Sequence, residues 1–445
     1  MTRVVIIGGG ITGLSAAWAL RQSPDPPEIM LLEQSDQLGG CIHTEQFNGF
    51  LMEHGPDVFL ARKPEAIQLC KALGLSLQKT NKDQRGAYLR RGHRLYPIPE
   101  GMSGLVPGRI WPLLSSPLIS LQGKLRVLAE LLLPPQTNGA DESIQDFFIR
   151  RFGREAFFGL IEPLLGGLAG GRADELSMKA LLPHTMNLES KYGSVLLGVG
   201  RMPTQEPTSP LLSLPDGLSS LITALTIVNE NSIRPGHKAT AITKIGAHWK
   251  VSIAGYAPLS ATDIILAVPA WSAAAITHSA IPELARLLHQ IPYHAGTMVH
   301  LAYHQTEAPR PLNGYGHLVA SDQATSSVAA CTWSAIKLAG RVPAGHLLFR
   351  LYLRGTKMTD KVILAQACAE MEQALGITAD PLFTRIHRFP AALPQYTLGH
   401  VGRIKEIHET ASFHSGLYLA GNYLDGVGIP DCIRNGIHAA HQIAN

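Results

Sequence analysis

Three glycines near the amino terminus have the spacing of a dinucleotide-binding turn. Gly8, Gly10 and Gly13 follow the β-branched run 4–7 and precede a stretch of small residues at 14–21. In this pattern the first glycine permits a tight turn, the second lets a pyrophosphate approach the backbone, and the third lets a helix pack closely on the strand. The pyrophosphate then lies at the positive end of that helix. The spacing alone is a weak signal, because a tight turn that binds nothing has the same pattern.

An acidic residue supports the nucleotide interpretation. Glu33 ends the second apolar run and comes twenty residues after Gly13. A carboxylate at this distance accepts hydrogen bonds from the ribose hydroxyls of an adenine dinucleotide, and it disfavours a 2′-phosphate. The expected ligand is therefore NAD or FAD, and residues farther along the chain must decide between them.

The composition excludes several classes of protein. The chain has 445 residues, which suggests two or three domains at roughly 100–200 residues each. Hydrophobic residues make up 45% and charged residues 16%, a balance that excludes a disordered chain. The net charge of +4 is too small over this length for a nucleic-acid-binding protein. The cysteines lie far apart in the sequence, which indicates a reducing cytosol and no disulfide framework.

The apolar segments predict no membrane span. The amino-terminal apolar run is too short for a signal peptide. Charges at Arg109, Lys124, Arg126 and Glu130 interrupt the region 105–135, so it lacks a stretch of about 18 apolar residues. We expect a cytoplasmic protein whose region 105–135 can still touch a membrane surface.

The periodicity of apolar residues predicts an α/β (α+β) protein. Strands are expected at 4–7, 29–33, 239–245, 248–254, 263–268, 298–304, 327–333 and 347–353. Helices are expected at 64–73, 147–152, 281–289, 361–375 and 432–443, and the region 85–180 should be largely helical. Ser143 and Asp146 resemble a capping box. His300 and His304 have the spacing of helical metal ligands, but their surroundings favour a strand, so no metal site is predicted.

Seven short segments together resemble the porphyrinogen oxidases of haem biosynthesis, within the flavin amine oxidase superfamily. They are Gly-Gly-Gly-Ile-Thr-Gly-Leu (8–14), Gly-Pro-Asp-Val-Phe-Leu (55–60), Arg-Leu-Tyr-Pro-Ile-Pro (94–99), Ile-Glu-Pro-Leu-Leu-Gly-Gly-Leu-Ala-Gly-Gly (161–171), Glu-Leu-Ser-Met (175–178), Leu-Pro-Gln-Tyr (393–396) and Gly-Val-Gly-Ile-Pro-Asp-Cys-Ile (426–433). They occur in this order over nearly the whole chain. Together they are far more specific than the glycine turn alone.

The resemblance implies FAD as the cofactor and a two-dinucleotide-binding-domain flavoprotein. A Rossmann-like FAD domain would comprise 1–42, 205–268 and 395–445. A mixed-sheet substrate domain would comprise 43–84, 180–204 and 269–394, and a helical cap would comprise 85–179. The residues assigned to the cofactor are Gly8, Gly9, Gly10, Ile11, Thr12, Gly13, Glu33, Gln34, Gly40, Cys41, Gly55, Pro56, Asp57, Val58, Ile242, Phe389, Gly426, Val427, Gly428 and Ile429. Cys41 and Phe389 depart from the family, which usually has a basic residue or Trp at the first position and Trp at the second.

The activity implied by the resemblance is oxidation of a porphyrinogen to a porphyrin by dioxygen in three two-electron steps, with release of H₂O₂. The substrate contacts would be Arg62, Lys63, Arg94, Leu168, Ala169 and Gly170, and the sequence offers no persuasive general base. Arg62-Lys63 resembles the enzymes that act on coproporphyrinogen III, which is favoured over protoporphyrinogen IX. A downstream enzyme of the haem pathway is a further expected partner.

Two other activities remain open at this point. The same superfamily contains oxidases and desaturases that act on amines or carotenoids. The same fold also serves as an escort protein without redox activity. The segment Gly-Asn-Tyr (421–423) followed by Gly-Val-Gly-Ile-Pro-Asp favours the porphyrinogen oxidases over both alternatives.

Overall fold

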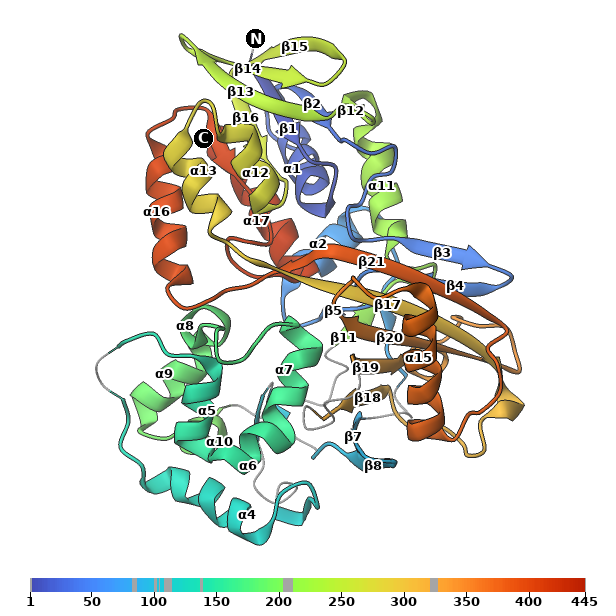
Figure 1. Cartoon of the computed structure of the whole chain (residues 1–445). Coiled ribbons are helices and arrows are strands. Elements are labelled where there is room, and N and C mark those ends of the chain that lie inside the picture. The colour runs from blue at the N-terminus through green and yellow to red at the C-terminus, as the bar shows by residue number, and fades with distance from the viewer. Residues whose placement is uncertain are drawn as a thin grey trace.

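A computed structural model describes residues 2–81, 86–99, 102–103, 105–107, 114–136, 139–202, 211–320 and 327–444. It has mixed parallel and antiparallel sheets with helices, as the sequence predicts. Figure 1 shows three parts. The sheet that contains the first strand of the chain lies at the top, and we call it the nucleotide-type sheet. A long, mostly antiparallel sheet lies below it on one side, and a group of helices, the third part, lies below it on the other. Within the described residues, no helix has the length and apolarity needed to cross a membrane.

The first sheet is parallel and reverses its strand order beside its first strand. From edge to edge it contains β12 (Ile233–Arg234), β2 (Glu28–Leu32), β1 (Arg3–Ile7), β16 (Asp263–Leu266) and β22 (Leu417–Leu419). The chain adds β2 and β12 on one side of β1, and it adds β16 and β22 on the other. Ligands of such sheets bind at the carboxyl ends of the strands where the order reverses.

Alternate residues of β1 build two different cores. Val4 and Ile6 pack in a core with the helices α1 (Ile11–Arg21), α2 (Pro64–Ala72), α11 (Ser219–Asn229) and α17 (Ile429–Ala444). Val5 and Ile7 pack on the opposite face with β13 (Ala239–Ile245), β14 (His248–Ile253), β15 (Tyr256–Ala261), α12 (Ala270–Thr277), α13 (Pro282–His289) and α16 (His400–Ser412). The period of two residues in a strand explains why a continuous β-branched run is needed here.

The second large sheet has seven strands in the order β21-β17-β20-β19-β18-β7-β8. Their bounds are Phe383–Pro394, Tyr293–His304, His346–Arg354, Val328–Trp333, Gly316–Val319, Tyr88–Arg91 and Arg94–Pro97. Helix α15 (Asp360–Leu375) covers one face through Ile363, Ala367 and Met371. The expected strand at 298–304 is confirmed, so His300 and His304 are not ligands on one helix face.

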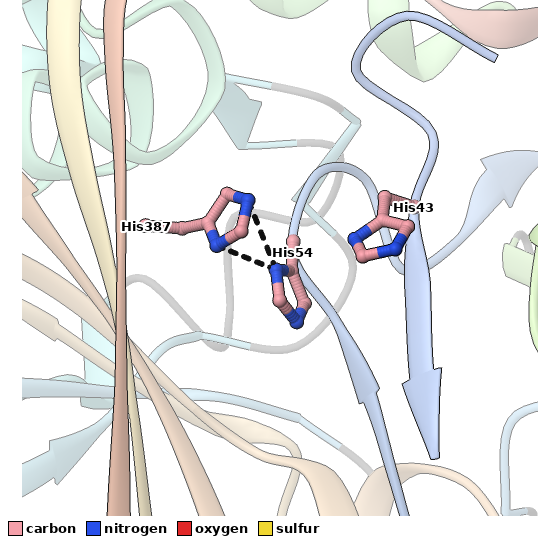
Figure 2. A group of neighbouring side chains, drawn as sticks. All are labelled: His43, His54 and His387. Carbon is pink, nitrogen blue, oxygen red and sulfur yellow. Dashed lines mark hydrogen bonds between the residues drawn. The ribbon is translucent and has the colours of Figure 1, made fainter. Parts of the chain in front are cut away.

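Short strands connect the two large sheets. The hairpin of β3 (Thr44–Phe47) and β4 (Phe50–Glu53) lies against β21, where His54 Nδ1 is 2.6 Å from His387 Nδ1 (Figure 2). A three-stranded sheet joins β5 (Phe59–Leu60), β11 (Leu211–Ser213) and β6 (Gln78–Lys79). The remaining short elements are β9 (Met102–Ser103), β10 (Val106–Pro107) and α14 (Ser334–Lys337).

The helices of the third part are α4 (Leu121–Leu128), η1 (Ala129–Leu132), α5 (Ile144–Phe152), α6 (Arg154–Ala156), η2 (Phe157–Ile161), α7 (Glu162–Ala169), α8 (Met178–Leu181), α9 (Pro183–Tyr192) and α10 (Val195–Gly200). The capping interaction is confirmed, because the Asp146 backbone N–H donates to the Ser143 hydroxyl at 3.0 Å. Ser143 also donates to the Asp146 carboxylate at 2.7 Å.

Three segments pack differently from the predicted division into domains. Helices α12 and α13 join the core of the nucleotide-type sheet and not that of the seven-stranded sheet. Helices α9 and α10 join the core of α5 and α7. Strands β7 and β8, inside the region expected to be largely helical, pair at the edge of the seven-stranded sheet. Helix packing and strand pairing between distant segments decide these three placements, and the local periodicity of apolar residues contains no information about such long-range contacts.

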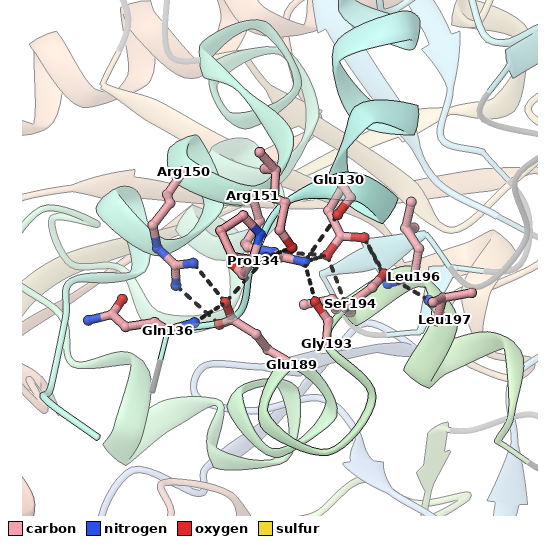
Figure 3. Close-up of polar contacts among 12 residues, drawn as sticks. Glu130, Pro134, Gln136, Arg150, Arg151, Glu189, Gly193, Ser194, Leu196 and Leu197 are labelled. Carbon is pink, nitrogen blue, oxygen red and sulfur yellow. Dashed lines mark hydrogen bonds and ion pairs between the residues drawn. The ribbon is translucent and has the colours of Figure 1, made fainter. Parts of the chain in front are cut away.

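A buried ion network holds the helices of the third part together (Figure 3). Arg151 and Glu130 are both fully buried, and Arg151 Nε donates to Glu130 at 2.8 Å. Glu130 also accepts from the Val195 backbone N–H at 2.8 Å and from the Ser194 hydroxyl. Arg150 pairs with Glu189 at 2.7 Å. The network therefore ties η1, α5, α9 and α10 into one unit.

We expect Arg151→Ala to destabilise the protein by about 3–5 kcal/mol, because it leaves buried carboxylates without their partner. Arg172→Ala is the matched control, since Arg172 pairs with Asp174 on the surface. The control should leave the denaturation midpoint unchanged. Urea denaturation of the two variants checks this, and equal midpoints for both variants would contradict the role of the network.

Candidate functional site

The glycine turn lies at the carboxyl end of β1, where the strand order reverses. Gly8 has a φ of +113°, and a Cβ there would lie 2.3 Å from the Ala267 carbonyl oxygen. A Cβ on Gly13 would lie 2.0 Å from the Gly8 carbonyl oxygen. At Gly10, by contrast, a Cβ would meet nothing within 4 Å. The turn is therefore closely packed at Gly8 and Gly13 and open at Gly10, where a pyrophosphate can approach.

The start of α1 offers free backbone donors to such a group. Gly10 is the N-cap, and the first turn contains no acidic residue. The first N–H groups of a helix have no partner inside the helix and attract anions. Gly40 lies opposite, because its Cβ would be 3.5 Å from Gly10 Cα. A cavity of about 440 Å³ is lined by Ser35, Asp36, Gln37, Leu38, Gly40 and His43.

Glu33 is next to this turn and also helps to hold it. Its carboxylate accepts from the Gly9 backbone N–H at 2.7 Å and from the Ser35 backbone N–H at 2.9 Å. The Glu33 carbonyl accepts from the His237 backbone N–H at 2.7 Å, so the start of the 237–245 segment adjoins Glu33. Gln34 is exposed, whereas Ile242 lies farther along β13 with a buried side chain. The adenine contact assigned to Ile242 stays a prediction.

The loop of Gly55, Pro56, Asp57 and Val58 passes directly beside Cys41. A Cβ on Gly55 would lie 1.8 Å from the Cys41 carbonyl oxygen. The Asp57 carboxylate pairs with Lys337 at 2.7 Å and with Arg350 at 3.5 Å, and these cations hold its pKa well below the usual range despite burial. Arg350 Nε also donates to the Glu53 carbonyl at 3.0 Å. Asp57 thus anchors the loop.

The carboxy-terminal segment brings a second helix start to the same place. Gly426 has a φ of +89°, and the Gly428 backbone N–H donates to Asp431 at 3.3 Å. Lys63 Nζ donates to both oxygens of the Asp431 carboxylate at 2.6 Å. Burial raises the pKa of Cys432, which follows Asp431, to about 12. Val427 and Ile429 complete this start of α17, which the Lys63–Asp431 pair ties to the residue before α2.

Helices α1 and α17 approach each other very closely. A Cβ on Gly436 would lie 2.1 Å from the Thr12 carbonyl oxygen. Ile11 and Thr12, in the first turn of α1, are buried in this region. Helices from the two ends of the sequence are therefore in direct contact at Thr12 and Gly436.

Several of the remaining motif segments meet on the side of the seven-stranded sheet. A Cβ on Gly170 would lie 2.8 Å from Tyr352 Oη and 3.0 Å from His294 Cδ2. The Ser177 backbone N–H donates to the Tyr396 carbonyl at 2.8 Å. The Tyr396 hydroxyl donates to the Asn422 carbonyl. The backbone of Leu168 and Ala169 ends helix α7 beside Gly170, and the side chains of these two residues lie outside the described part of the chain.

Three residues that the sequence analysis missed face this junction. Tyr352 Oη and His294 Nε2 are buried without a hydrogen-bond partner among the described residues, which is the state expected of groups that contact a ligand. Arg354 Nη2 lies 3.3 Å from the position of a Cβ on Gly166. Burial and the Arg354 charge lower the pKa of His294, and burial raises that of Tyr352 to about 12. The expected strand 347–353 could have placed Tyr352 and Arg354 on one face by its period of two.

Other predicted residues lie apart from this junction. Arg94 is exposed on β8, at the edge of the seven-stranded sheet opposite β21. Arg62 is exposed at the start of α2. Phe389 lies on β21 opposite Gly296, with its ring 5.6 Å from that of His387. The Cys41 side chain is accessible to solvent, yet the surrounding protein raises the pKa of its thiol.

Comparison with known proteins agrees with this geometry. The model of the flavin containing amine oxidoreductases matches residues 11–444. The chain belongs to this family. It is therefore an oxidoreductase, and the cofactor of its nucleotide cleft is FAD. The open side of Gly10, the uncapped start of α1 and the start of α17 fit this dinucleotide.

Relatives within the family are similar over their whole length. The coproporphyrinogen III oxidase of Bacillus subtilis (strain 168) is 32% identical, covering 97% of this chain and 96% of the relative. Human protoporphyrinogen oxidase is 29% identical, covering 99% of this chain and 98% of the relative. A crystal structure from Exiguobacterium sp. 255-15, assigned provisionally as a protoporphyrinogen oxidase, has a TM-score of 0.88 at 31% identity, covering 100% of this chain and 98% of that chain.

Two glycine variants separate cofactor binding from folding. We expect Gly10→Ala to fold, because its Cβ meets no protein atom, but to lose at least about tenfold in FAD affinity, or about 1.4 kcal/mol. We expect Gly13→Ala to reduce the yield of folded protein, because its Cβ collides with the Gly8 carbonyl. Flavin titration and thermal denaturation measure the two effects. Unchanged FAD affinity in Gly10→Ala would contradict the pyrophosphate position.

Proposed function

We propose that this protein oxidises coproporphyrinogen III to coproporphyrin III in haem biosynthesis, with FAD as cofactor. The observation that carries the proposal is the junction of Gly170, Tyr352 and His294 beside the Tyr396–Asn422 contact. This junction brings the motif segments 161–171 and 393–396, which resemble the porphyrinogen oxidases, next to the segment that leads into α17. The names of the relatives, which include both coproporphyrinogen III and protoporphyrinogen oxidases, support the same reaction class.

The chain's own residues would position the substrate and exclude water. FAD, when bound, supplies the acceptor for a hydride from a meso carbon of the macrocycle. The absence of a side chain at Gly170 lets Tyr352 and His294 pack against the end of α7, and the buried hydroxyl of Tyr352 and imidazole of His294 would orient the ring of the substrate. The Asp431–Lys63 pair keeps the turn 426–428 folded at the other side of the cleft.

We propose dioxygen as the electron acceptor. Conversion of a porphyrinogen to a porphyrin removes six electrons and six protons, which three molecules of dioxygen accept to give three molecules of H₂O₂. Each round removes two electrons, so the macrocycle must tautomerise and present a hydrogen to the same point again. This requirement suits a pocket that orients the ring without a dedicated general base.

Cations at the pocket favour the substrate with more carboxylates. Coproporphyrinogen III carries four propionates and protoporphyrinogen IX carries two. Arg354 is exposed beside Gly166, and Arg62 is exposed next to Lys63. An arginine binds a carboxylate through two parallel hydrogen bonds. We propose that Arg354 binds a propionate at the rim of this junction.

Porphyrin fluorescence in air, measured with each porphyrinogen separately, tests the reaction and the substrate. We expect coproporphyrinogen III to be oxidised faster, and we expect Arg354→Leu to raise its KM by about tenfold through loss of one charged hydrogen bond. Lys405→Leu is the control, because Lys405 lies on the outer helix α16 with an exposed side chain. Fluorescence no faster than autoxidation with both substrates would overturn the proposed function.

We also propose that α4 and η1 touch a membrane surface. Leu121, Leu125 and Leu132 are 75%, 60% and 87% exposed, which is unusual for leucines of one short region. Leu121 and Leu125 share a helix face, and Lys124 lies beside them in the sequence. Apolar side chains flanked by basic residues are typical of helices that lie in a lipid interface.

Sedimentation with anionic phospholipid vesicles tests this contact. We expect the wild type to bind and the double variant Leu121→Gln/Leu125→Gln to bind at least several-fold more weakly, because it loses most of the exposed apolar area. Phe413→Ser is the matched control, since Phe413 is 84% exposed elsewhere on the molecule. Equal binding by the double variant and the wild type would contradict the proposal.

A further inference from the structure

Three imidazoles that take no part in the proposed reaction meet between the hairpin and the seven-stranded sheet. His43 precedes β3, His54 follows β4, and His387 lies on β21. One ring nitrogen from each lies within 4.8 Å of the others. Figure 2 shows the His54 ring between the other two, with ring centroids 4.7 Å from His43 and 3.9 Å from His387. Segments far apart in the sequence thus bring three nitrogen ligands to one point.

A carboxylate orients the central ring. His54 Nε2 is 3.0 Å from Glu45 Oε2, and Glu45 Oε1 accepts from Arg385 Nε at 2.7 Å. A histidine that binds a metal usually donates its second N–H to such a carboxylate, which fixes the tautomer. With Nε2 donating to Glu45, the lone pair of His54 Nδ1 points toward His387.

The surroundings keep the imidazoles in the form that binds metals. Burial, together with the neighbouring imidazoles of His387 and His43, lowers the pKa of His54 to about 4. Burial and His43 also lower the pKa of His387. Burial therefore favours the uncharged form of both rings, and His387 Nδ1 can bind a cation once its proton has moved to Nε2.

We propose that His43, His54 and His387 bind a divalent transition-metal ion of the zinc class. The three imidazoles would supply three ligands, with water as the fourth. Nitrogen ligands lie about 2.0–2.1 Å from zinc, so two of them are about 3.3 Å apart in a tetrahedron. His54 Nδ1 and His387 Nδ1 are 2.6 Å apart, and the ring of His387 must turn away by less than an ångström.

The expected role of the metal ion is structural. It would join the β3–β4 hairpin, which follows Gly40 and Cys41 and precedes Gly55, to the strand that carries Phe389. Both segments adjoin the cofactor cleft, so the ion would fix the distance between them. The arrangement without metal is a hydrogen bond from His387 to His54, which the experiment must distinguish from a metal site.

Equilibrium dialysis of the FAD-loaded enzyme against Zn²⁺, with the bound metal counted by atomic emission, tests the proposal. We expect one Zn²⁺ per chain with a Kd of about 1 µM or tighter. His387→Ala should weaken binding by at least about 100-fold, and Glu45→Gln by about 10–100-fold. Zn²⁺ should also raise the melting temperature of the wild type and not that of His387→Ala.

His304→Ala is the matched control, because His304 is an exposed histidine at the far end of β17, with its ring centroid 5.0 Å from that of His346. The His304→Ala variant should still bind one Zn²⁺ per chain. His387→Gln serves as a second, more conservative ligand variant if His387→Ala loses its FAD. Wild-type stoichiometry in both ligand variants would overturn the proposal, and so would absence of tight Zn²⁺ binding by the wild type.

Discussion

The close contact of α1 with α17 is the constraint on which the cofactor cleft depends. The two helices come from opposite ends of the chain, and only a glycine at 436 lets them approach, since a Cβ there would lie 2.1 Å from the Thr12 carbonyl oxygen. Because of this approach, the first turn of α1 packs directly on α17. The first N–H groups of α1 have no partner inside the helix and lie at its positive dipole end, which suits the pyrophosphate of a dinucleotide.

The buried charges of this protein mostly hold the backbone in place. Asp57 pairs with Lys337 and Arg350 and fixes the loop beside Cys41. Asp431 accepts from Lys63 and from the Gly428 backbone, and it keeps the last glycine-rich turn folded. Because its cationic partners hold its pKa well below the usual range, Asp57 is a poor proton acceptor, which agrees with a reaction whose redox chemistry comes from the cofactor.

The fold alone does not decide the reaction. A UDP-galactopyranose mutase shares the architecture with a TM-score of 0.76 at 16% identity, so the same framework occurs in an enzyme with a different name and chemistry. The proposed reaction depends instead on the residues where α7, β17 and β20 meet. Gly170 lies there beside His294 and Tyr352, both of which follow it by more than a hundred residues in the sequence.

The sequence by itself determined the glycine turn and most strands and helices, because these depend on residues that are close together in the chain. FAD was implied by the motif segments that resemble the porphyrinogen oxidases and are spread over nearly the whole chain. Gly8, Gly10 and Gly13 are recognisable by spacing, and β17 by the composition of 298–304. The tertiary structure alone decided that Lys63 pairs with Asp431, that Arg94 lies at the far edge of the sheet, and that α12 and α13 cover the nucleotide-type sheet. It also brought His43, His54 and His387 together. These placements depend on strand order and on packing between distant segments, and no local pattern of residues encodes them.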